Sequence, residues 1–134
     1  MASQQQDLIF GLDQEKIVLP ILEKYFNDKI QHTKDKYSKF DFQGEKFKYE
    51  LKSRKIKHNQ YKTALLGYNK KPDDTQEQYF IFNYIDGIYY IKYEDTLFNS
   101  FDVKDFQRNK RIDYNDTLKP HYFIPYEKLT KIEV

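Results

Sequence analysis

The sequence contains no cysteine, only four glycines and only three histidines. The absence of cysteine excludes disulfides, thiolate zinc sites and a cysteine nucleophile. With so few glycines, neither a G-x-G-x-x-G pattern nor a P-loop is present, which argues against a glycine-rich phosphate cradle. The three histidines, His32, His58 and His121, are too scattered to indicate a histidine metal site.

Long apolar runs are also missing, because Lys, Glu or Asn interrupts each of them. No segment looks like a signal peptide or a membrane span, so we expect a soluble intracellular protein of the cytoplasm or nucleus with no membrane partner. The 134 residues suffice for one ordinary domain, and 18% of them are aromatic. We expect a flexible N-terminus and lead-in over residues 1–11 and a single domain over residues 12–134.

Charge is abundant and segregated, although the formal net charge is only +2. Ten charged residues fall between Lys46 and Lys71, and nine of them are basic. The one acid is Glu50, two residues before Lys52. A carboxylate among lysines is explained if it holds a metal ion while the cations hold a polyanion.

Hydrophobic periodicity predicts one early helix and several strands. The helix is expected over residues 12–26, with Asp13 as its N-cap and a kink at Pro20. Asp86-Gly87 is a strong hairpin signal. The expected strands are 37–42, 47–52, 62–68, 79–84, 88–93 and 122–125, with Gln43-Gly44 as a turn, a short strand near Phe101 and a short helix or turn over 126–132. The fold class is therefore α/β or α+β with a mixed sheet.

The strand alternation places Glu50 and Lys52 on one face, about 7 Å apart along the strand. Asp41 lies nine residues before Glu50 and is the candidate for a second carboxylate. A two-residue turn at Gln43-Gly44 pairs Asp41 with Lys46, which leaves Asp41 about 13 Å from Glu50 along the strand. A bend or bulge is then needed to bring the two acids together.

These residues resemble the signature of the PD-(D/E)XK nuclease superfamily: Asp41, then Glu50-x-Lys52 on a strand, after a helix that carries Glu15. The strings Phe40-Asp41-Phe42, Glu50-Leu51-Lys52-Ser53-Arg54, Gly67-Tyr68-Asn69-Lys70 and His121-Tyr122-Phe123-Ile124-Pro125 also resemble small nuclease-like proteins of large DNA viruses. The resemblance covers most of residues 12–132. It implies a single-domain restriction-endonuclease-like core, with a mixed central β-sheet flanked by helices.

The resemblance also implies a catalytic site and its metal. Asp41 and Glu50 would bind Mg²⁺ or Mn²⁺, which prefer carboxylate oxygens, with the carbonyl of Leu51 as a third ligand. Lys52 would orient the attacking water or accept its proton. Glu15 is a further candidate catalytic residue that would hold water or a second ion.

Each of these residues also has a plainer explanation. Glu50 and Lys52 would equally suit an exposed strand face with nothing bound, and Asp41 would suit a residue entering a turn. An acid at Glu15 is expected from the helix dipole alone. The basic residues would suit a solvated face, or they would contact nucleic acid; the candidates are Lys48, Ser53, Arg54, Lys55, Lys57, Lys62, Lys70, Arg108 and Arg111.

The expected function is a Mg²⁺- or Mn²⁺-dependent endonuclease that hydrolyses phosphodiester bonds, with DNA favoured as the nucleic-acid partner. An RNA endonuclease and a non-catalytic nucleic-acid-binding module on the same fold remain as alternatives. A protein–protein adaptor would show no affinity for either metal or nucleic acid. The small size makes a homodimer plausible, although no residue pattern establishes one.

Overall fold

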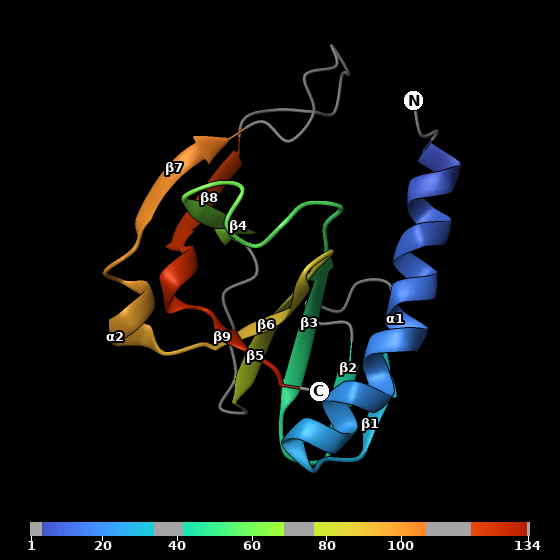
Figure 1. Ribbon diagram of the computed structural model, residues 1–134. Coiled ribbons are helices and arrows are strands. Elements are labelled where there is room, and N and C mark those ends of the chain that lie inside the picture. Colours follow the sequence, from blue (N-terminus) through green and yellow to red (C-terminus); the bar gives the residue numbers. More distant parts are fainter. Residues whose placement is uncertain (1–3, 34–41, 69–76, 107–118, 134) are drawn as a thin grey trace.

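The computed structural model describes residues 4–33, 42–68, 77–106 and 119–133, with side chains from residue 14 onward. Strands outnumber helices among these residues (Figure 1). The elements in chain order are α1 (Gln4–Phe26), β1 (Ile30–His32), β2 (Phe42–Gly44), β3 (Lys48–Ser53), β4 (Thr63–Gly67), β5 (Gln78–Tyr84), β6 (Gly87–Lys92), α2 (Asp95–Phe98), β7 (Asp102–Phe106), β8 (Lys119–Pro125), the 3₁₀ turn η2 (Tyr126–Lys128) and β9 (Thr130–Lys131).

The larger sheet has six strands in the order β1-β2-β3-β5-β6-β9. Its β3 and β5 run parallel, while the other neighbouring pairs are antiparallel, so the sheet is mixed. A smaller antiparallel sheet has the order β4-β8-β7. The predicted α/β class with a mixed central sheet is confirmed at this level.

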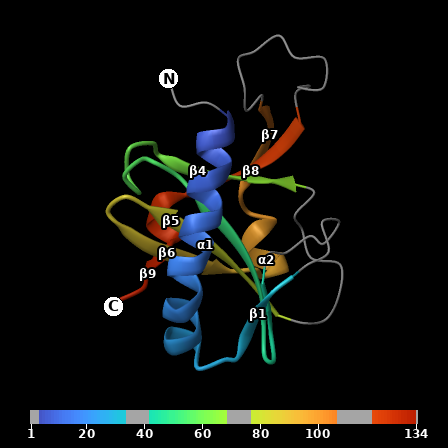
Figure 2. The ribbon, with the colours of Figure 1, turned by 90° about the vertical axis from the view of Figure 1, so that its right-hand side faces the viewer.

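The two faces of the larger sheet have different coverings, because side chains alternate along each strand. One face packs against α1 through a cluster that includes Val18, Leu22 and Tyr49. The other face packs against the smaller sheet and α2 through a cluster that includes Phe80 and Phe82. Figure 2 shows α1 lying along its face of the larger sheet. The finer expectation of a sheet flanked by helices is not confirmed in the described residues, where α1 packs on one face and the smaller sheet with the short α2 packs on the other.

Helix α1 begins at Gln4 and not at the predicted residue 12, so Asp13 lies within the helix and is not its N-cap. The ribbon in Figure 1 bends in the second half of α1, which contains Pro20, as expected from a missing backbone hydrogen bond. The helix ends before Asn27, whose φ of 49° is a left-handed conformation that asparagine tolerates. Among the described residues, no helix has the length and apolar character that crossing a bilayer requires.

The hairpin between β2 and β3 turns two residues later than predicted. Gln43 and Gly44 belong to β2, and the Gly44 N–H donates to the carbonyl of Phe47 at 2.8 Å to close the turn. The glycine is needed for close packing, because a Cβ on it would overlap the carboxylate of Asp28. Gly44 therefore looked like a turn residue in the sequence but instead makes room for a buried acid.

The later turn changes the register of the hairpin. Phe42 pairs with Tyr49 in a regular antiparallel ladder. Lys46 lies in the turn, so the expected pairing of Asp41 with Lys46 is wrong. Asp41 itself lies outside the described residues. Its neighbour Phe42 is thus opposite the residue that precedes Glu50.

The hairpin predicted around Asp86-Gly87 is confirmed as β5–β6, with Tyr84 paired to Gly87. Gly87 has a φ of 151°, which side-chain-bearing residues rarely adopt. The strand expected over 62–68 is confirmed as β4. It pairs with β8, more than fifty residues later in the chain, and this pairing builds the smaller sheet.

Candidate catalytic site

Strand β3 separates its side chains onto the two faces of the larger sheet. Tyr49 and Leu51 enter the cluster beneath α1. Glu50 and Lys52 lie on the opposite face, beside Phe80 and Phe82 of β5 in the parallel register. The predicted shared face of Glu50 and Lys52 is confirmed.

The two side chains form an ion pair, in which Glu50 is buried and Lys52 is half-buried. Lys52 Nζ lies 3.3 Å from Glu50 Oε1, and Glu50 as a whole is only 3% exposed. Burying a carboxylate is costly unless cations or hydrogen-bond donors compensate its charge. An exposed strand face with nothing bound is therefore the wrong description of this pair. Because the carboxylate of Glu50 is buried, its presence is not explained by a contribution to solubility.

Gln78 is a buried polar residue on the same face of the sheet, which sequence reasoning missed. It pairs with Lys48 in the β3–β5 ladder, and Lys48 is two residues before Glu50 on β3. Its Nε2 atom is buried and has no hydrogen-bond partner. A bound group could accept a hydrogen bond from such a buried donor. The available signal was a glutamine at the start of the otherwise apolar string Gln78-Tyr79-Phe80-Ile81-Phe82.

The second predicted carboxylate, Asp41, lies outside the described residues. Within the described residues no group of three or more His, Asp or Glu side chains comes together as a metal site. The part of the site that the structure describes is therefore the pair of Glu50 and Lys52, with Gln78 nearby on β5. The Leu51 side chain packs beneath α1, and the role of its carbonyl stays a prediction.

Glu15 is held on the other side of the sheet. Its Oε2 atom lies 2.9 Å from Nε2 of His32, in β1. The ring of His32 is 5.5 Å from that of Phe42, which belongs to the cluster beneath α1. The structure thus does not bring Glu15 to Glu50 and Lys52, and its acid is accounted for by the contact with histidine.

The residues predicted to contact phosphate differ in where they lie and in how exposed they are. Ser53 faces α1, where its Oγ accepts a hydrogen bond from Asn83 Nδ2 at 3.2 Å, so it is turned away from the face of Glu50 and Lys52. Arg54 is half-buried at the end of β3, and its Nη1 donates to the carbonyl of Ser53. Lys48 is half-buried, and three of the other predicted contacts are exposed, namely Lys55, Lys57 and Lys62. Lys70, Arg108 and Arg111 lie outside the described residues.

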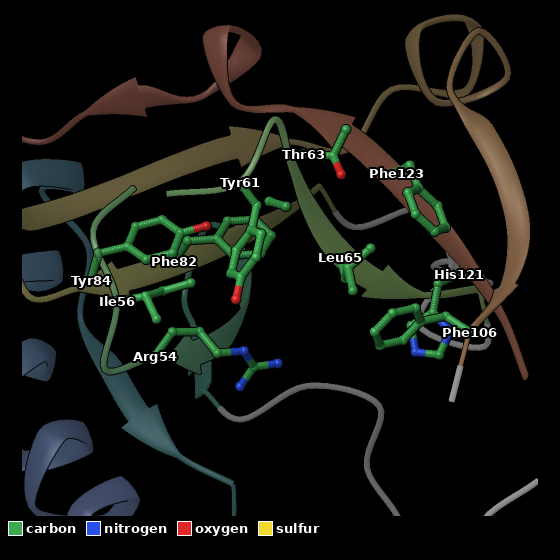
Figure 3. Close-up of a pocket in the computed structure, with 11 residues that line it drawn as sticks. Arg54, Ile56, Tyr61, Thr63, Leu65, Phe82, Tyr84, Phe106, His121 and Phe123 are labelled. Carbon is green, nitrogen blue, oxygen red and sulfur yellow. The ribbon is translucent and has the colours of Figure 1, made fainter. Parts of the chain in front are cut away.

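A pocket of about 560 Å³ is lined by residues that neighbour Lys52 in the sheet, although neither Glu50 nor Lys52 lines it. Phe82, the neighbour of Lys52 on β5, belongs to its wall. Figure 3 shows Arg54 and Tyr61 toward one end of the pocket and Phe106, His121 and Phe123 toward the other. The remaining lining residues are Ile56, Thr63, Ala64, Leu65 and Tyr84. Its volume falls within the range of small-molecule sites.

Two polar side chains of this pocket can be described by their protonation or their hydrogen bonds. Burial raises the pKa of the Tyr84 hydroxyl above its ordinary value, and the Arg54 cation offsets this only in part. Tyr84 is therefore a neutral phenol near pH 7. His121 is buried, and its Nδ1 lies 2.8 Å from the carbonyl oxygen of Lys119.

Comparison with protein-family models, curated proteins and solved structures finds no match to this chain. The features that bear on function are therefore local: the ion pair of Glu50 and Lys52, the basic segment that follows this pair, and the nearby pocket.

Proposed function

We propose that this protein is a Mg²⁺- or Mn²⁺-dependent endonuclease that hydrolyses phosphodiester bonds in DNA. Its fold would be a restriction-endonuclease-like core of the PD-(D/E)XK type. The observation that carries the proposal is the contact of 3.3 Å between the half-buried Lys52 and the buried Glu50 on one central strand. The strand register supports it, because Phe42 follows Asp41 in the sequence and pairs with the residue before Glu50.

The donor chemistry fits a hard divalent cation. Glu50 supplies a buried carboxylate, Asp41 would supply a second, and the carbonyl of Leu51 would complete the protein ligands. Magnesium sites in phosphate-processing enzymes commonly use only one or two carboxylates, together with water and substrate oxygens. The unpartnered amide of Gln78 marks the same face as one that can take a further polar group. When bound, the cation would stabilise negative charge on the phosphate and activate a water molecule.

Lys52 would act on the water and on the phosphate. Its ammonium group is held by the carboxylate of Glu50, so the direction of its remaining N–H donors is constrained. A donated hydrogen bond would orient the attacking water, and the positive charge would offset charge that develops on the phosphate. The low dielectric around a buried pair strengthens both effects. In this proposal Lys52 is a catalytic residue and Glu50 is both a metal ligand and the partner of Lys52.

A substrate panel tests the proposal. The protein is incubated with Mn²⁺ and labelled single strands, duplexes, flaps, four-way junctions and RNA. We expect cleavage of at least one DNA substrate, which EDTA abolishes. Cleavage of RNA alone would replace the DNA assignment. Metal-independent binding without any cleavage would identify a binding module, which the exposed lysines after β3 also favour.

Asp41→Asn tests the second carboxylate. We expect its affinity for Mn²⁺, measured by titration calorimetry, to fall by about tenfold or more, equivalent to about 1.4 kcal/mol. Asp105→Asn, which changes an exposed acid on β7, is the matched control and should bind Mn²⁺ like the unmodified protein. Equal affinity in all three proteins would remove Asp41 from the site.

The exposed lysines that follow β3 should contribute to binding through phosphate contacts. For Lys55→Ala combined with Lys57→Ala, we expect weaker DNA binding and a salt dependence reduced by about one to two units of log–log slope. The matched control is Lys16→Ala with Lys24→Ala, two exposed lysines on α1. Fluorescence anisotropy at several salt concentrations measures both slopes. A slope that does not change would place Lys55 and Lys57 away from the substrate.

A further inference from the structure

The pocket beside Lys52 combines flat apolar surfaces with cationic and hydrogen-bonding groups. Tyr61 is 61% exposed and Phe106 is 37% exposed, so part of each ring is available to a ligand. Phe123 also lines the pocket, at the same end as Phe106, and the two ring centroids are 6.4 Å apart. The rings on this wall therefore offer faces on which a planar ligand can stack.

The positive charge around the pocket favours a planar ligand that carries negative charge. Arg54 projects into it, and none of the described lining residues is Asp or Glu. Lys104 Nζ lies 5.5 Å from the centre of the Phe123 ring, although Asp102 is 3.9 Å from the same ammonium. A planar, electron-rich group attached to an anion suits these surroundings. A nucleobase on its phosphate backbone has this combination.

The position of the pocket links it to the candidate catalytic pair. Arg54 is two residues after Lys52, and its N–H donates to the carbonyl of Asn83, so the parallel ladder continues one residue past β3. Lys52 and Arg54 therefore follow one another on the same face, about 7 Å apart along the chain. Phe82 pairs with Lys52 and also lines the pocket. A chain held at Lys52 would place an adjoining nucleotide over the pocket.

From this arrangement we infer that the pocket takes an unpaired nucleobase next to the phosphate held at Glu50 and Lys52. The inference rests on the proposed nuclease function and adds its substrate class, which is single-stranded nucleic acid or a strand with an extruded base. A paired base has its faces covered by its stacked neighbours, so it cannot enter between aromatic side chains. The hydroxyls of Thr63 and Tyr84 and the guanidinium of Arg54 would then contact the base edge or its phosphate.

Binding in EDTA tests the pocket separately from cleavage. The probes are a thymine-rich single strand with one 2-aminopurine at successive positions, the same strand with one abasic site, and its duplex. We expect the single strand to bind at least about tenfold more tightly than the duplex. We also expect 2-aminopurine fluorescence to fall at one position, where the base stacks on the rings. An abasic site at that position should weaken binding by about tenfold.

Two variants assign these effects to the pocket. Tyr61→Ala, and Tyr61→Ala with Phe106→Ala, should each weaken single-strand binding, the double variant by about tenfold or more, and remove the position-dependent quenching. Tyr25→Ala is the matched control, since Tyr25 is 40% exposed on the α1 face. Thermal melting identifies any loss that comes from unfolding. Because Tyr61 is the most exposed of these rings, the single variant tests the pocket even if the double variant does not fold.

The outcomes separate the two proposals. Equal binding of single strand, abasic strand and duplex, unchanged in Tyr61→Ala, would overturn the pocket while leaving metal-dependent cleavage intact. Position-dependent quenching that disappears in Tyr61→Ala supports the pocket even if no substrate is cut with Mn²⁺. In that second case the nuclease proposal fails, and a module that binds single strands remains.

Discussion

Glu50→Gln is expected to lower the rate of Mn²⁺-dependent cleavage by at least about a thousandfold, equivalent to roughly 4 kcal/mol of activation free energy. The substitution retains the size of the side chain and removes the charge that would bind the cation. It also removes the carboxylate that lies 3.3 Å from Lys52 Nζ, so the ammonium loses a group that orients it. Both losses affect the same step, and the expected effect is therefore large.

The same variant tests the cost of the buried pair. Removing one partner of a buried ion pair typically costs about 3–5 kcal/mol of stability, because the other charge loses its compensation. We therefore expect Glu50→Gln to melt at a lower temperature, and Glu50→Gln with Lys52→Met to recover part of the loss. Both proteins should remain inactive. Recovered stability without recovered cleavage shows that the pair serves chemistry and not only folding.

The matched control is the other described lysine–glutamate pair beside β5. Lys92 Nζ lies 3.0 Å from Glu77 Oε1, in a more exposed setting. Glu77→Gln should leave cleavage unchanged and stability within about 0.5 kcal/mol. Full activity in Glu50→Gln, measured under conditions where the protein is folded, would sink the proposed site. It would point to another centre or to a contaminating nuclease.

Asp28→Ala is expected to lower the free energy of unfolding by about 3 kcal/mol. Asp28 is 7% exposed and lies just after the end of α1. Its carboxylate accepts hydrogen bonds from the N–H groups of Lys46 and Phe47, at 3.0 and 3.3 Å, and from the hydroxyl of Tyr49 at 2.9 Å. These donors belong to the β2–β3 turn and to β3, so one carboxylate joins the helix end to the strand that carries Glu50.

Thermal melting and urea titration measure this effect, and the melting temperature should fall by about 10 °C. Asp28→Asn should lose less, because an amide oxygen still accepts hydrogen bonds. Tyr49→Phe should cost about 1 kcal/mol, since only one of the three donors is removed. Burial and the hydrogen bond to Asp28 raise the pKa of Tyr49 well above its ordinary range, so its hydroxyl remains a donor at working pH. Stability unchanged in Asp28→Ala would show that the turn folds without this carboxylate.

Local patterns in the sequence predicted the parts of the site that depend on short-range geometry. Strand alternation was enough to place Glu50 and Lys52 on one face, and Asp86-Gly87 was enough to locate the β5–β6 hairpin. Both depend on neighbours within a few residues. The burial of Glu50 was not predictable, because it depends on β5 lying in parallel beside β3.

The errors arose where distant residues decide the local structure. Glycine is typical of turns, but Gly44 lies inside β2. It is required there because the carboxylate of Asp28, sixteen residues earlier, leaves no room for a Cβ. The observed register of the β2–β3 hairpin therefore differs from the predicted one. The smaller sheet was unpredictable for the same reason, since β4 pairs with β8 across more than fifty residues. Gln78 gave a signal only in hindsight, as a polar residue among aromatics.

The central position of β3 has a consequence for how the site behaves over time. The strand lies between β2 and β5. All of Lys48–Ser53 pairs with β5, and Lys48 and Tyr49 also pair with β2. Strands in such positions open only with the whole domain, whereas edge strands such as β1 and β9 open locally at lower cost. Amide hydrogens around Glu50 should thus exchange with solvent deuterium among the slowest in the molecule. Glu50 and Lys52 should therefore keep their spacing while the edge strands open and close.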